Sequence, residues 1–220
     1  MSNYNIRLYK DSDYDIVRDI FVCGITEPYT LSIRHTLSLP RVWILILAMF
    51  LLALMTTGCS KASFTVVIAF LLFLLLKNRD VFFSYARGSL AGDLLDIKKN
   101  YLQRDGCCFW VAESEGEIVG MVAASPFPHP GGQKQVALRR LSVPMKHRGR
   151  GIGKALCKTV IDFAQKSGYQ AVVLETAAFR VDSLYLYKSL GFKITNIFTE
   201  NFYFRRFIDY IDISLQYDLP

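Results

Sequence analysis

Two apolar blocks dominate the pattern of hydrophobic and polar positions along the chain. Residues Val42–Met55 are all apolar, and a second block, Phe64–Leu76, contains a single polar residue. Lys61 is the only charge within residues 42–76. Because neither block has a polar face, the pattern predicts two helices that are apolar all round, unlike the amphipathic helices of a soluble surface.

The length of this segment limits how it can sit in a membrane. As one helix, residues 42–76 would be about 52 Å long, well beyond a hydrocarbon core of ~30 Å. As two legs joined at Thr56–Ser63, each leg would reach only about 20 Å. We therefore expect a hairpin that enters the membrane and returns to the same side. Two short spans that recruit the linker residues are the first alternative, and a buried helical hairpin in a soluble core is the second.

Basic residues flank the segment on both sides, which favours a cytosolic position for both flanks. These residues are Arg34, Arg41, Lys77, Arg79 and Arg87. We expect no secretory signal peptide, because about forty polar and mixed residues precede the first block.

The rest of the chain has the alternating periods of a mixed α/β domain. Strand patterns are predicted at residues 4–9, 109–113, 118–124, 136–143, 171–176, 193–199 and 210–217. Helical patterns are predicted at residues 11–21, 94–104, 152–167 and 184–190. We expect one interrupted domain: residues 1–39 form its first strand and helix, residues 40–80 the hydrophobic segment, and residues 81–220 the remainder.

Composition changes this picture little. The chain has 220 residues, is 52% hydrophobic and carries a net charge of +7. Disorder is excluded by the apolar content, and a multipass transporter by the length of ordinary sequence. The cysteines follow neither a disulfide-framework nor a zinc spacing, so we expect a reducing compartment and no metal site. They are Cys23, Cys59, Cys107, Cys108 and Cys157.

A glycine-rich turn stands between the strand pattern ending at Val143 and the helical pattern from Ile152. It reads Arg148-Gly149-Arg150-Gly151-Ile152-Gly153. Residues 118–161 around it contain no Asp or Glu but eight Lys or Arg. Glycines let several backbone N–H groups point outward at a helix N-terminus, which predicts a phosphate site. The spacing is neither that of a dinucleotide fold nor that of a P-loop.

The turn resembles the acetyl-CoA signature of the Gcn5-related N-acetyltransferase (GNAT) superfamily, [Q/R]-x-x-G-x-[G/A], as Arg148-x-x-Gly151-x-Gly153. Leu186–Phe192 is similar to that superfamily's LYxxxGF element, and the opening Ile6-Arg7 strand matches as well. The hydrophobic insertion resembles that of the camello-type membrane-bound acetyltransferases. That branch acetylates cysteine S-conjugates, lysines of secretory-pathway proteins, or aspartate.

The resemblance implies a GNAT-type mixed central sheet flanked by helices, with a hydrophobic membrane hairpin inserted between the first two helices. It implies an acetyl-CoA-dependent N-acetyltransferase that moves an acetyl group to a primary amine, either a cysteine S-conjugate or a protein lysine, by direct attack. Acetyl-CoA is then the co-substrate. The implied location is the endoplasmic reticulum membrane, with the Golgi as the alternative. The basic flanks, not the resemblance, lead us to expect the catalytic domain in the cytosol.

The resemblance also suggests catalytic residues. Tyr187 is the candidate acid for the leaving thiolate. Glu175 is the candidate base, because bacterial ribosomal-protein acetyltransferases place a catalytic Glu at the same offset of twelve residues before the Tyr. Glu175 lies in an apolar strand pattern, so we expect burial to raise its pKa toward neutrality. His129 and His147 are alternative bases.

For the cofactor, the resemblance implies backbone hydrogen bonds from Leu141 and Val143 to the pantetheine arm. Residues 148–153 would hold the pyrophosphate, and Lys154 or Lys146 the 3′-phosphate. Ser183 does not reproduce the Asn that many relatives place before the Tyr helix.

Other functions remain as alternatives. The first is a catalytically silent module that binds acyl-CoA or a membrane. Nucleic-acid binding from the charge of +7 lacks a recognised motif, so we expect no nucleic-acid partner. Cys107-Cys108 is more typical of a strand entering the core than of a lipidation site. The aromatic and basic residues 202–207 are more typical of a hairpin connection than of a lipid or acceptor contact.

Overall fold

A seven-stranded sheet forms the centre of the computed structural model, which describes residues 4–128, 131–199 and 203–220. Its strand order is β1-β2-β3-β4-β5-β7-β6, and all neighbours are antiparallel except β4 and β5, which are parallel. The strands are β1 (Asn5–Leu8), β2 (Cys108–Ser114), β3 (Glu117–Phe127), β4 (Gln135–Ser142), β5 (Ala171–Ala177), β6 (Lys193–Phe198) and β7 (Asp212–Asp218).

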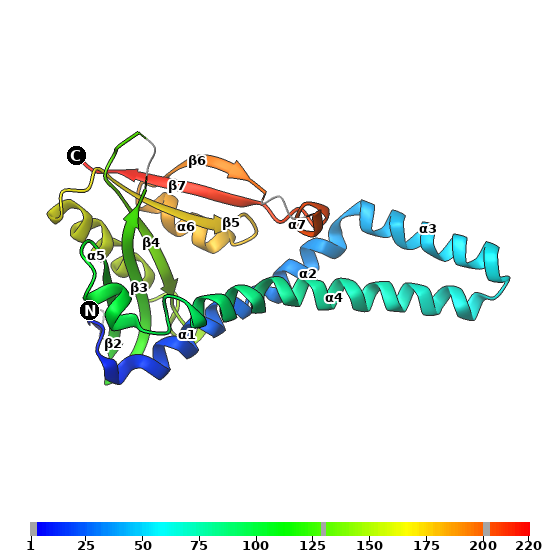
Figure 1. Ribbon diagram of the computed structural model, residues 1–220, viewed down its shortest axis with the longest axis horizontal. Helices are drawn as coiled ribbons and strands as arrows, with labels where there is room; N and C mark the ends of the chain where they lie inside the picture. Colours follow the sequence, from blue (N-terminus) through cyan, green and yellow to red (C-terminus); the bar gives the residue numbers. More distant parts are fainter. Residues whose placement is uncertain (1–3, 129–130, 200–202) are drawn as a thin grey trace.

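Helices cover both faces of the sheet, and a pair of helices projects away from it (Figure 1). The α-helices are α1 (Tyr14–Thr26), α2 (Tyr29–Ser38), α3 (Pro40–Thr57), α4 (Ser60–Ala91), α5 (Ile152–Lys166), α6 (Val181–Ser189) and α7 (Tyr203–Phe207). Short helical turns occupy Asp11–Asp13, Lys98–Leu102 and Met145–His147.

The alternation of side chains along β2 shows how the two faces are filled. Phe109 and Val111 belong to a buried cluster with residues of α1 and the end of α4. Trp110 and Ala112 belong to a second buried cluster with residues of α5. Because successive residues of a strand point to opposite faces, α5 lies on one side of the sheet and α1 with α4 on the other.

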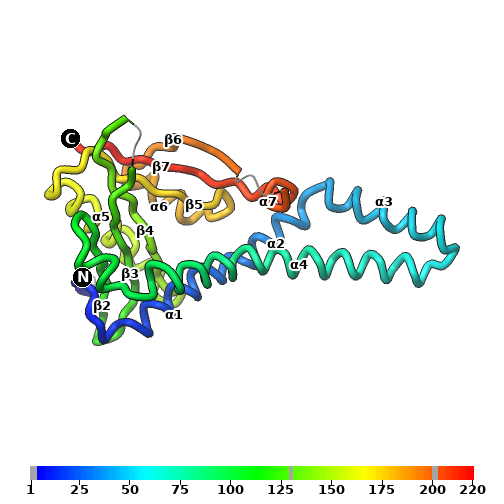
Figure 2. Tube along the Cα trace, viewed as in Figure 1, coloured from blue at the N-terminus to red at the C-terminus, as the bar shows by residue number. Residues whose placement is uncertain are grey.

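The projecting pair, which we call the arm, consists of α3 and the first half of α4 (Figure 2). At 1.5 Å per residue, α3 is about 27 Å long and α4 about 48 Å. Gly58, with a φ of 63°, turns the chain between them. Both helices are long and apolar enough to cross a membrane, and only 11% of the most apolar window of each is buried.

Hydrogen bonds between buried polar side chains fix the arm where it leaves the domain. Asn78 of α4 is 1% exposed and accepts a hydrogen bond of 2.9 Å from the hydroxyl of Ser32. Its amide nitrogen donates to the hydroxyl of Thr36 at 3.0 Å. Both partners lie on α2, so the arm is joined to the domain by polar bonds that only one helix register satisfies.

The predicted fold class is confirmed: a mixed sheet is flanked by helices, and two apolar helices form a hairpin before the second strand. Two details differ. Each leg is longer than predicted, because α3 includes residues on both sides of the apolar block and α4 continues to Ala91 as one helix. The helix predicted at residues 94–104 is reduced to a turn at Lys98–Leu102.

Candidate active site

The parallel strands β4 and β5 diverge after a short paired stretch. Gln135–Ala137 pairs with Ala171–Val173. Among the residues that the structure describes, no other residues of the two strands pair with each other. From there β4 follows β3 to Ser142, whereas β5 follows β7 to Ala177. A cavity of about 1510 Å³ lies at the divergence, and residues of both strands line it. The exposed backbone of β4 is therefore available to an extended ligand in the manner of an added strand.

β4 also bends at a β-bulge. Met121 pairs with Ser142 and Ala123 with Arg139, so Arg140 and Leu141 together oppose one residue of β3. Arg140 has a φ of 58°, in the left-handed region that side chains with a Cβ seldom adopt. That conformation costs roughly 1–2 kcal/mol, which the surroundings of Arg140 must offset.

The guanidinium of Arg140 is held by helix α4 and the residues that follow it. It donates to Asp93 at 3.0 and 2.6 Å, to the Ser89 hydroxyl at 2.9 Å and to the Tyr85 hydroxyl at 3.1 Å. Its central carbon lies 4.9 Å from the centroid of the Phe21 ring. Tyr85 and Ser89 are four residues apart on one face of α4, and Asp93 lies two residues beyond the end of the helix. The bend in β4 is thus maintained by the same helix that forms the arm.

The glycine-rich turn begins α5 next to this cavity. Gly149 and Gly151 have φ values of 76° and 80°, and Gly151 is the N-cap of α5. A Cβ added at Gly153 would lie 3.3 Å from the Leu186 side chain, so a larger residue there would force a shift. The free N–H groups of the first turn of α5 and the helix dipole make this position suitable for phosphate.

The Arg148 side chain binds protein groups. Its guanidinium donates to the Glu27 carboxylate at 2.8 and 2.6 Å and to the backbone carbonyl of Val143 at 2.9 Å. Glu27 directly follows α1, so this pair joins the turn to the opposite edge of the cavity. The backbone N–H of Arg148 also donates to a protein group, the carbonyl of Met145 at 3.2 Å.

The other basic candidates differ in their access to the cavity. Lys154 is exposed and lines it, whereas Lys146 is paired with Glu117 at 3.4 Å. Arg150 lies 3.3 Å from Nδ1 of His147, whose side chain is mostly buried beside the turn. His129, the other alternative base, lies outside the described residues.

Both catalytic candidates line the cavity. Tyr187 of α6 is 7% exposed, and its ring packs against Phe192 at a centroid distance of 5.8 Å. Burial, with a smaller contribution from the Cys157 thiol, raises the pKa of Tyr187 above its usual value. Glu175 on β5 is exposed, opposite Ser214 of β7, so the burial that we expected for this carboxylate is absent.

An aromatic cluster forms another part of the cavity wall. The rings of Phe82, Phe179 and Tyr210 contact one another with centroid distances of 5.4 to 6.3 Å. Arg205 lies over the Tyr210 ring at 4.7 Å. Burial raises the pKa of Tyr210 to about 12. Arg205 also pairs with Asp212 at 3.5 Å, so this wall combines apolar rings with an ion pair at their edge.

Comparisons with known proteins agree with this arrangement. Residues 76–192 match the Acetyltransferase (GNAT) family. N-acetyltransferase 8B of Mus musculus is 40% identical to the chain over 221 residues, covering 100% of this chain and 95% of that protein. An acetyltransferase of the GNAT family from Staphylococcus aureus has the same fold, with a TM-score of 0.59, 15% identity and 99% coverage of both chains. The Salmonella typhimurium protein yncA, a putative acetyltransferase described with its cofactor acetyl-CoA, has a TM-score of 0.55, 17% identity, and coverage of 99% of this chain and 95% of that chain.

The fold and the relatives define an acetyl-CoA-dependent N-acetyltransferase. The chain belongs to the GNAT family and, within it, to the camello-type branch that contains the N-acetyltransferase 8 proteins. A catalytically silent module is therefore not the function of this domain.

Sequence reasoning missed several residues that shape the site. Glu27, Asp93 and Arg140 were not singled out, because each gains its role from a contact across more than 40 residues of chain. In the sequence, Arg140 is one of the eight basic residues counted at residues 118–161. The only sign of the bend in the sequence is the doublet Arg139-Arg140 within a strand pattern. Successive side chains of a regular strand point to opposite faces of the sheet, so one of two adjacent arginines would have to point into the core.

Proposed function

We propose that the chain transfers the acetyl group of acetyl-CoA to a primary amine by direct attack, with Glu175 as base and Tyr187 as acid. The amine nitrogen attacks the thioester carbonyl carbon, and the bond from that carbon to sulfur breaks. Glu175 removes one proton from the acceptor's ammonium group before the attack, which frees the lone pair of the nitrogen. Tyr187 gives its phenolic proton to the thiolate, and the second proton that the nitrogen loses on forming the amide restores the tyrosine. The observation that carries the proposal is that both side chains line the cavity at the divergence of β4 and β5.

The state of each group suits its role. Because the pKa of Tyr187 is raised, its hydroxyl stays protonated at neutral pH and remains available as a donor. Glu175 is exposed in the cavity and so is accessible to an incoming ammonium group. A buried acid and an accessible base divide the two proton transfers between different surroundings.

For the cofactor, we propose that the backbone of Leu141 and Val143 pairs with the pantetheine arm. Residues 148–153 would hold the pyrophosphate, with residues 149–153 providing backbone N–H groups, and Lys154 would bind the 3′-phosphate. The cavity, the left-handed glycines and the exposed Lys154 fit such a ligand. The acetyl-CoA described with the Salmonella protein supports the choice of co-substrate.

The aromatic wall favours a cysteine S-conjugate as acceptor, with a protein lysine as the second candidate. Phe82, Phe179 and Tyr210 would receive an apolar S-substituent, and Arg180 or Arg205 would meet its carboxylate. The test is an assay of microsomes with labelled acetyl-CoA and S-benzyl-cysteine, a lysine peptide or aspartate. Labelling of S-benzyl-cysteine first is expected, and labelling of aspartate alone would contradict the proposal.

We also propose that the arm anchors the enzyme in the endoplasmic reticulum membrane, with the domain in the cytosol. α3 and the part of α4 from Ser60 to Lys77 are each about 27 Å long, close to the ~30 Å of a hydrocarbon core. These lengths support two short spans more than a hairpin that turns within the membrane. In either case both ends of the arm lie on the same side.

Two native cysteines can test this topology. Cys23 on α1 and Cys59 at the tip of the arm are both exposed. In sealed microsomes, a membrane-impermeant maleimide should label Cys23 at once but Cys59 only after the membrane is permeabilised. Cys23→Ser and Cys59→Ser variants assign each label. Immediate labelling of both cysteines would contradict a membrane-spanning arm, and protection of Cys23 would contradict a cytosolic domain.

A further inference from the structure

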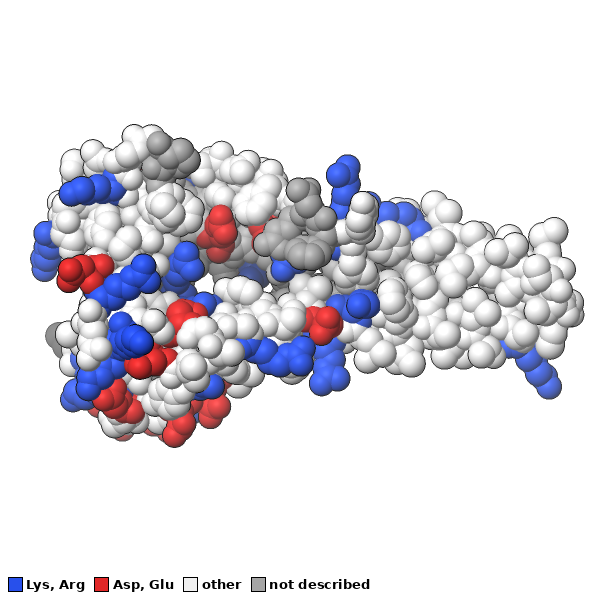
Figure 3. Space-filling view, in the orientation of Figure 1, with Lys and Arg blue, Asp and Glu red and all other residues white. Residues whose placement is uncertain are grey.

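Cations gather at one level of the molecule, where the arm meets the domain. Asn78 accepts a hydrogen bond from Ser32 and donates one to Thr36, which places the end of α2 level with the middle of α4. Arg34 lies between Ser32 and Thr36 on α2, and Lys77 and Arg79 flank Asn78 on α4. All three side chains are exposed. Figure 3 shows Lys and Arg side chains around this junction, while the visible face of the arm beyond it carries no charge except for a cation near its tip.

A distant part of the chain joins the same level. Helix α7, in the connection between β6 and β7, lies against the beginning of the arm (Figure 1). Asp209, which follows α7, forms an ion pair with Arg41 at the start of α3. The guanidinium of Arg41 also lies 6.0 Å from the centroid of the Phe207 ring. These two contacts fix α7 beside the arm, although more than 160 residues separate the two in sequence.

The outer side of α7 carries side chains that the domain does not bury. Tyr203 is 95% exposed, and Arg206 is exposed as well. Within the part of the chain that the structure describes, no ion pair is formed by Arg34, Lys77, Arg79 or Arg206. Four cations and a tyrosine are therefore exposed on the surface where the apolar arm meets the domain.

We propose that this surface binds anionic phospholipid headgroups, and that α7 is a second membrane contact besides the arm. We call it the interfacial collar, made of Arg34, Lys77, Arg79, Tyr203 and Arg206. The inference rests on the proposed insertion of the arm. With the arm in hydrocarbon, the collar lies at headgroup level, where tyrosine and basic residues are enriched and where cations are attracted to anionic lipid.

The order of residues along the molecule supports a lipid surface as the partner. Along α4, apolar residues up to Leu76 are followed at once by Lys77 and Arg79. The charge of the collar is opposite to that of phosphatidylserine, and it is continuous with the apolar arm. Its residues come from three helices, so the collar forms only when the chain is folded. Each cation is expected to raise the affinity for an anionic surface about fivefold.

Hydrogen exchange of the full chain in nanodiscs can test the collar. One set of nanodiscs contains phosphatidylcholine alone, and the other a mixture of phosphatidylcholine and phosphatidylserine. Exchange of the amides of α7 is expected to slow about fivefold in the mixture, and high salt should remove the difference. Arg206→Gln should reduce the slowing, and combining it with Lys77→Gln should abolish it. Lys166→Gln, on α5 at the other face of the sheet, should leave it unchanged.

The legs of the arm serve as an internal reference in the same experiment. The amides of α3 and the outer half of α4 could be protected from exchange while those of α7 exchange at the same rate in both lipids. In that case the collar proposal is wrong, but the proposed membrane anchor is supported. Equal slowing of α7 in neutral lipid would also overturn headgroup recognition by charge. If the legs exchange freely in every nanodisc, the proposed membrane anchor itself fails. Unchanged exchange in the strands of the sheet shows that each variant is folded.

Discussion

Helix α5 and the outer half of α4 have the same backbone geometry but opposite surface patterns. On α5, Leu156 and Val160 are fully buried against the sheet, while Lys154 and Lys158 are exposed. On the outer half of α4, residues spaced four apart are apolar and largely exposed: Phe64 is 58%, Ile68 64% and Leu72 54% exposed. A helix with one apolar face packs that face against protein, whereas a helix that is apolar all round is typical of a protein core or of a membrane span.

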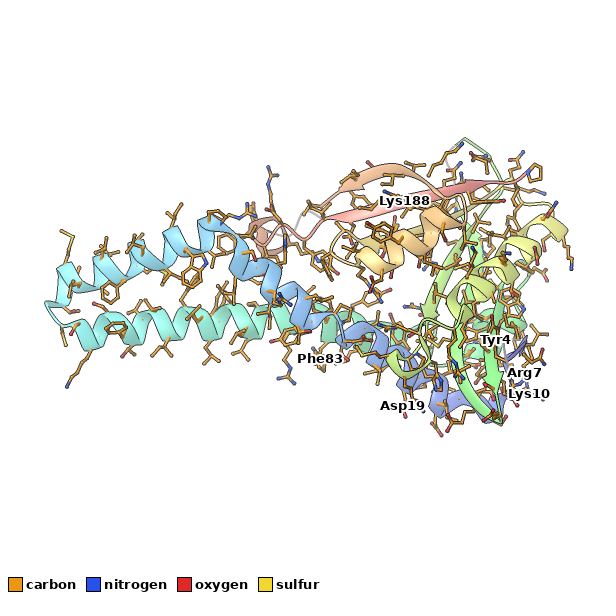
Figure 4. All side chains as sticks on the ribbon, turned by 180° about the vertical axis from the view of Figure 1, so that it is seen from behind. Tyr4, Arg7, Lys10, Asp19, Phe83 and Lys188 are labelled. Atoms are coloured by element: carbon orange, nitrogen blue, oxygen red, sulfur yellow. The ribbon has the colours of Figure 1, made fainter. Side chains whose placement is uncertain are left out.

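The inner half of α4 resembles α5. There Phe82, Ala86 and Ser89 are buried at helical spacing against the domain. The change from exposed apolar residues to residues packed against the domain occurs between Leu76 and Phe82 within one uninterrupted helix, around the buried Asn78. Figure 4 shows side chains radiating from the arm helices on every side, in contrast to the packed domain. Catalysis and folding should therefore depend on the domain, and membrane attachment on the arm.

The largest expected effect separates catalysis from attachment. Glu175→Gln and Tyr187→Phe should each lower kcat by about 10²–10⁴-fold, because each removes a proton transfer. Both variants should still sediment with membranes after alkaline extraction. Lys188→Gln, an exposed neighbour on α6, is the matched control and should keep full activity. Unchanged turnover in either catalytic variant would show that the assigned roles are wrong.

The next effect lies where the two regions meet. Asp93→Asn should destabilise the domain by about 3–5 kcal/mol, because it leaves the buried Arg140 without its carboxylate. It should also raise the KM for acetyl-CoA, since the bend in β4 loses its support. Denaturant unfolding and initial rates measure the two effects. Asp80→Asn, which breaks the exposed pair with Arg87, is the control and should change stability by less than about 1 kcal/mol. A normal KM in Asp93→Asn would contradict the coupling of α4 to β4.

The contrast between the helices can be tested with matched truncations. Leu156→Ala on α5 should lower the free energy of unfolding by about 2–5 kcal/mol, because it leaves a cavity against the sheet. Ile68→Ala on the outer half of α4 should leave the unfolding of the domain in detergent unchanged. Equal losses would mean that the arm packs against protein, as in the buried hairpin considered from the sequence.

The smallest effect depends on pH and should be confined to the domain. Burial alone would raise the pKa of Asp13, but hydrogen bonds from Arg7 and from the Lys10 backbone outweigh it and lower the pKa. The folded-state pKa is then below the unfolded value, so this stabilisation is present above about pH 4 and is lost as pH falls. Arg7 lies far from the arm (Figure 4). Asp13→Asn should flatten the acid side of the stability profile, measured by thermal unfolding, without altering membrane attachment.

Much of the fold was predictable because its patterns are local. The apolar blocks, the amphipathic helix at 152–167 and the turn at 148–153 each depend on residues close together in sequence, and the structure contains all three. The ends of the arm helices were not predictable from hydrophobicity. Asn78 looks like a polar terminator in sequence, but its hydrogen bonds to Ser32 and Thr36 keep it inside a continuous helix.

The site was predictable only in part. Tyr187 and Glu175 were singled out by resemblance, and the cavity brings both to one surface. The left-handed Arg140 and its partner Asp93 were not, because a network between α4 and β4 depends on how the insertion joins the sheet. The exposure of Glu175 was also missed, since a strand pattern rich in apolar residues does not show that β4 leaves β5 uncovered there.

The continuity of α4 limits which changes of length the chain can tolerate. Each residue of an α-helix turns the chain by about 100°, so one residue inserted between Leu76 and Phe82 would rotate the arm by that angle relative to the domain. The contacts of Asn78 and the position of Lys77 and Arg79 in the collar would be lost together. Insertions at the tip near Gly58 change no such relation. Related chains should therefore vary in length at the tip of the hairpin and keep a constant residue count from Asn78 to Asp93.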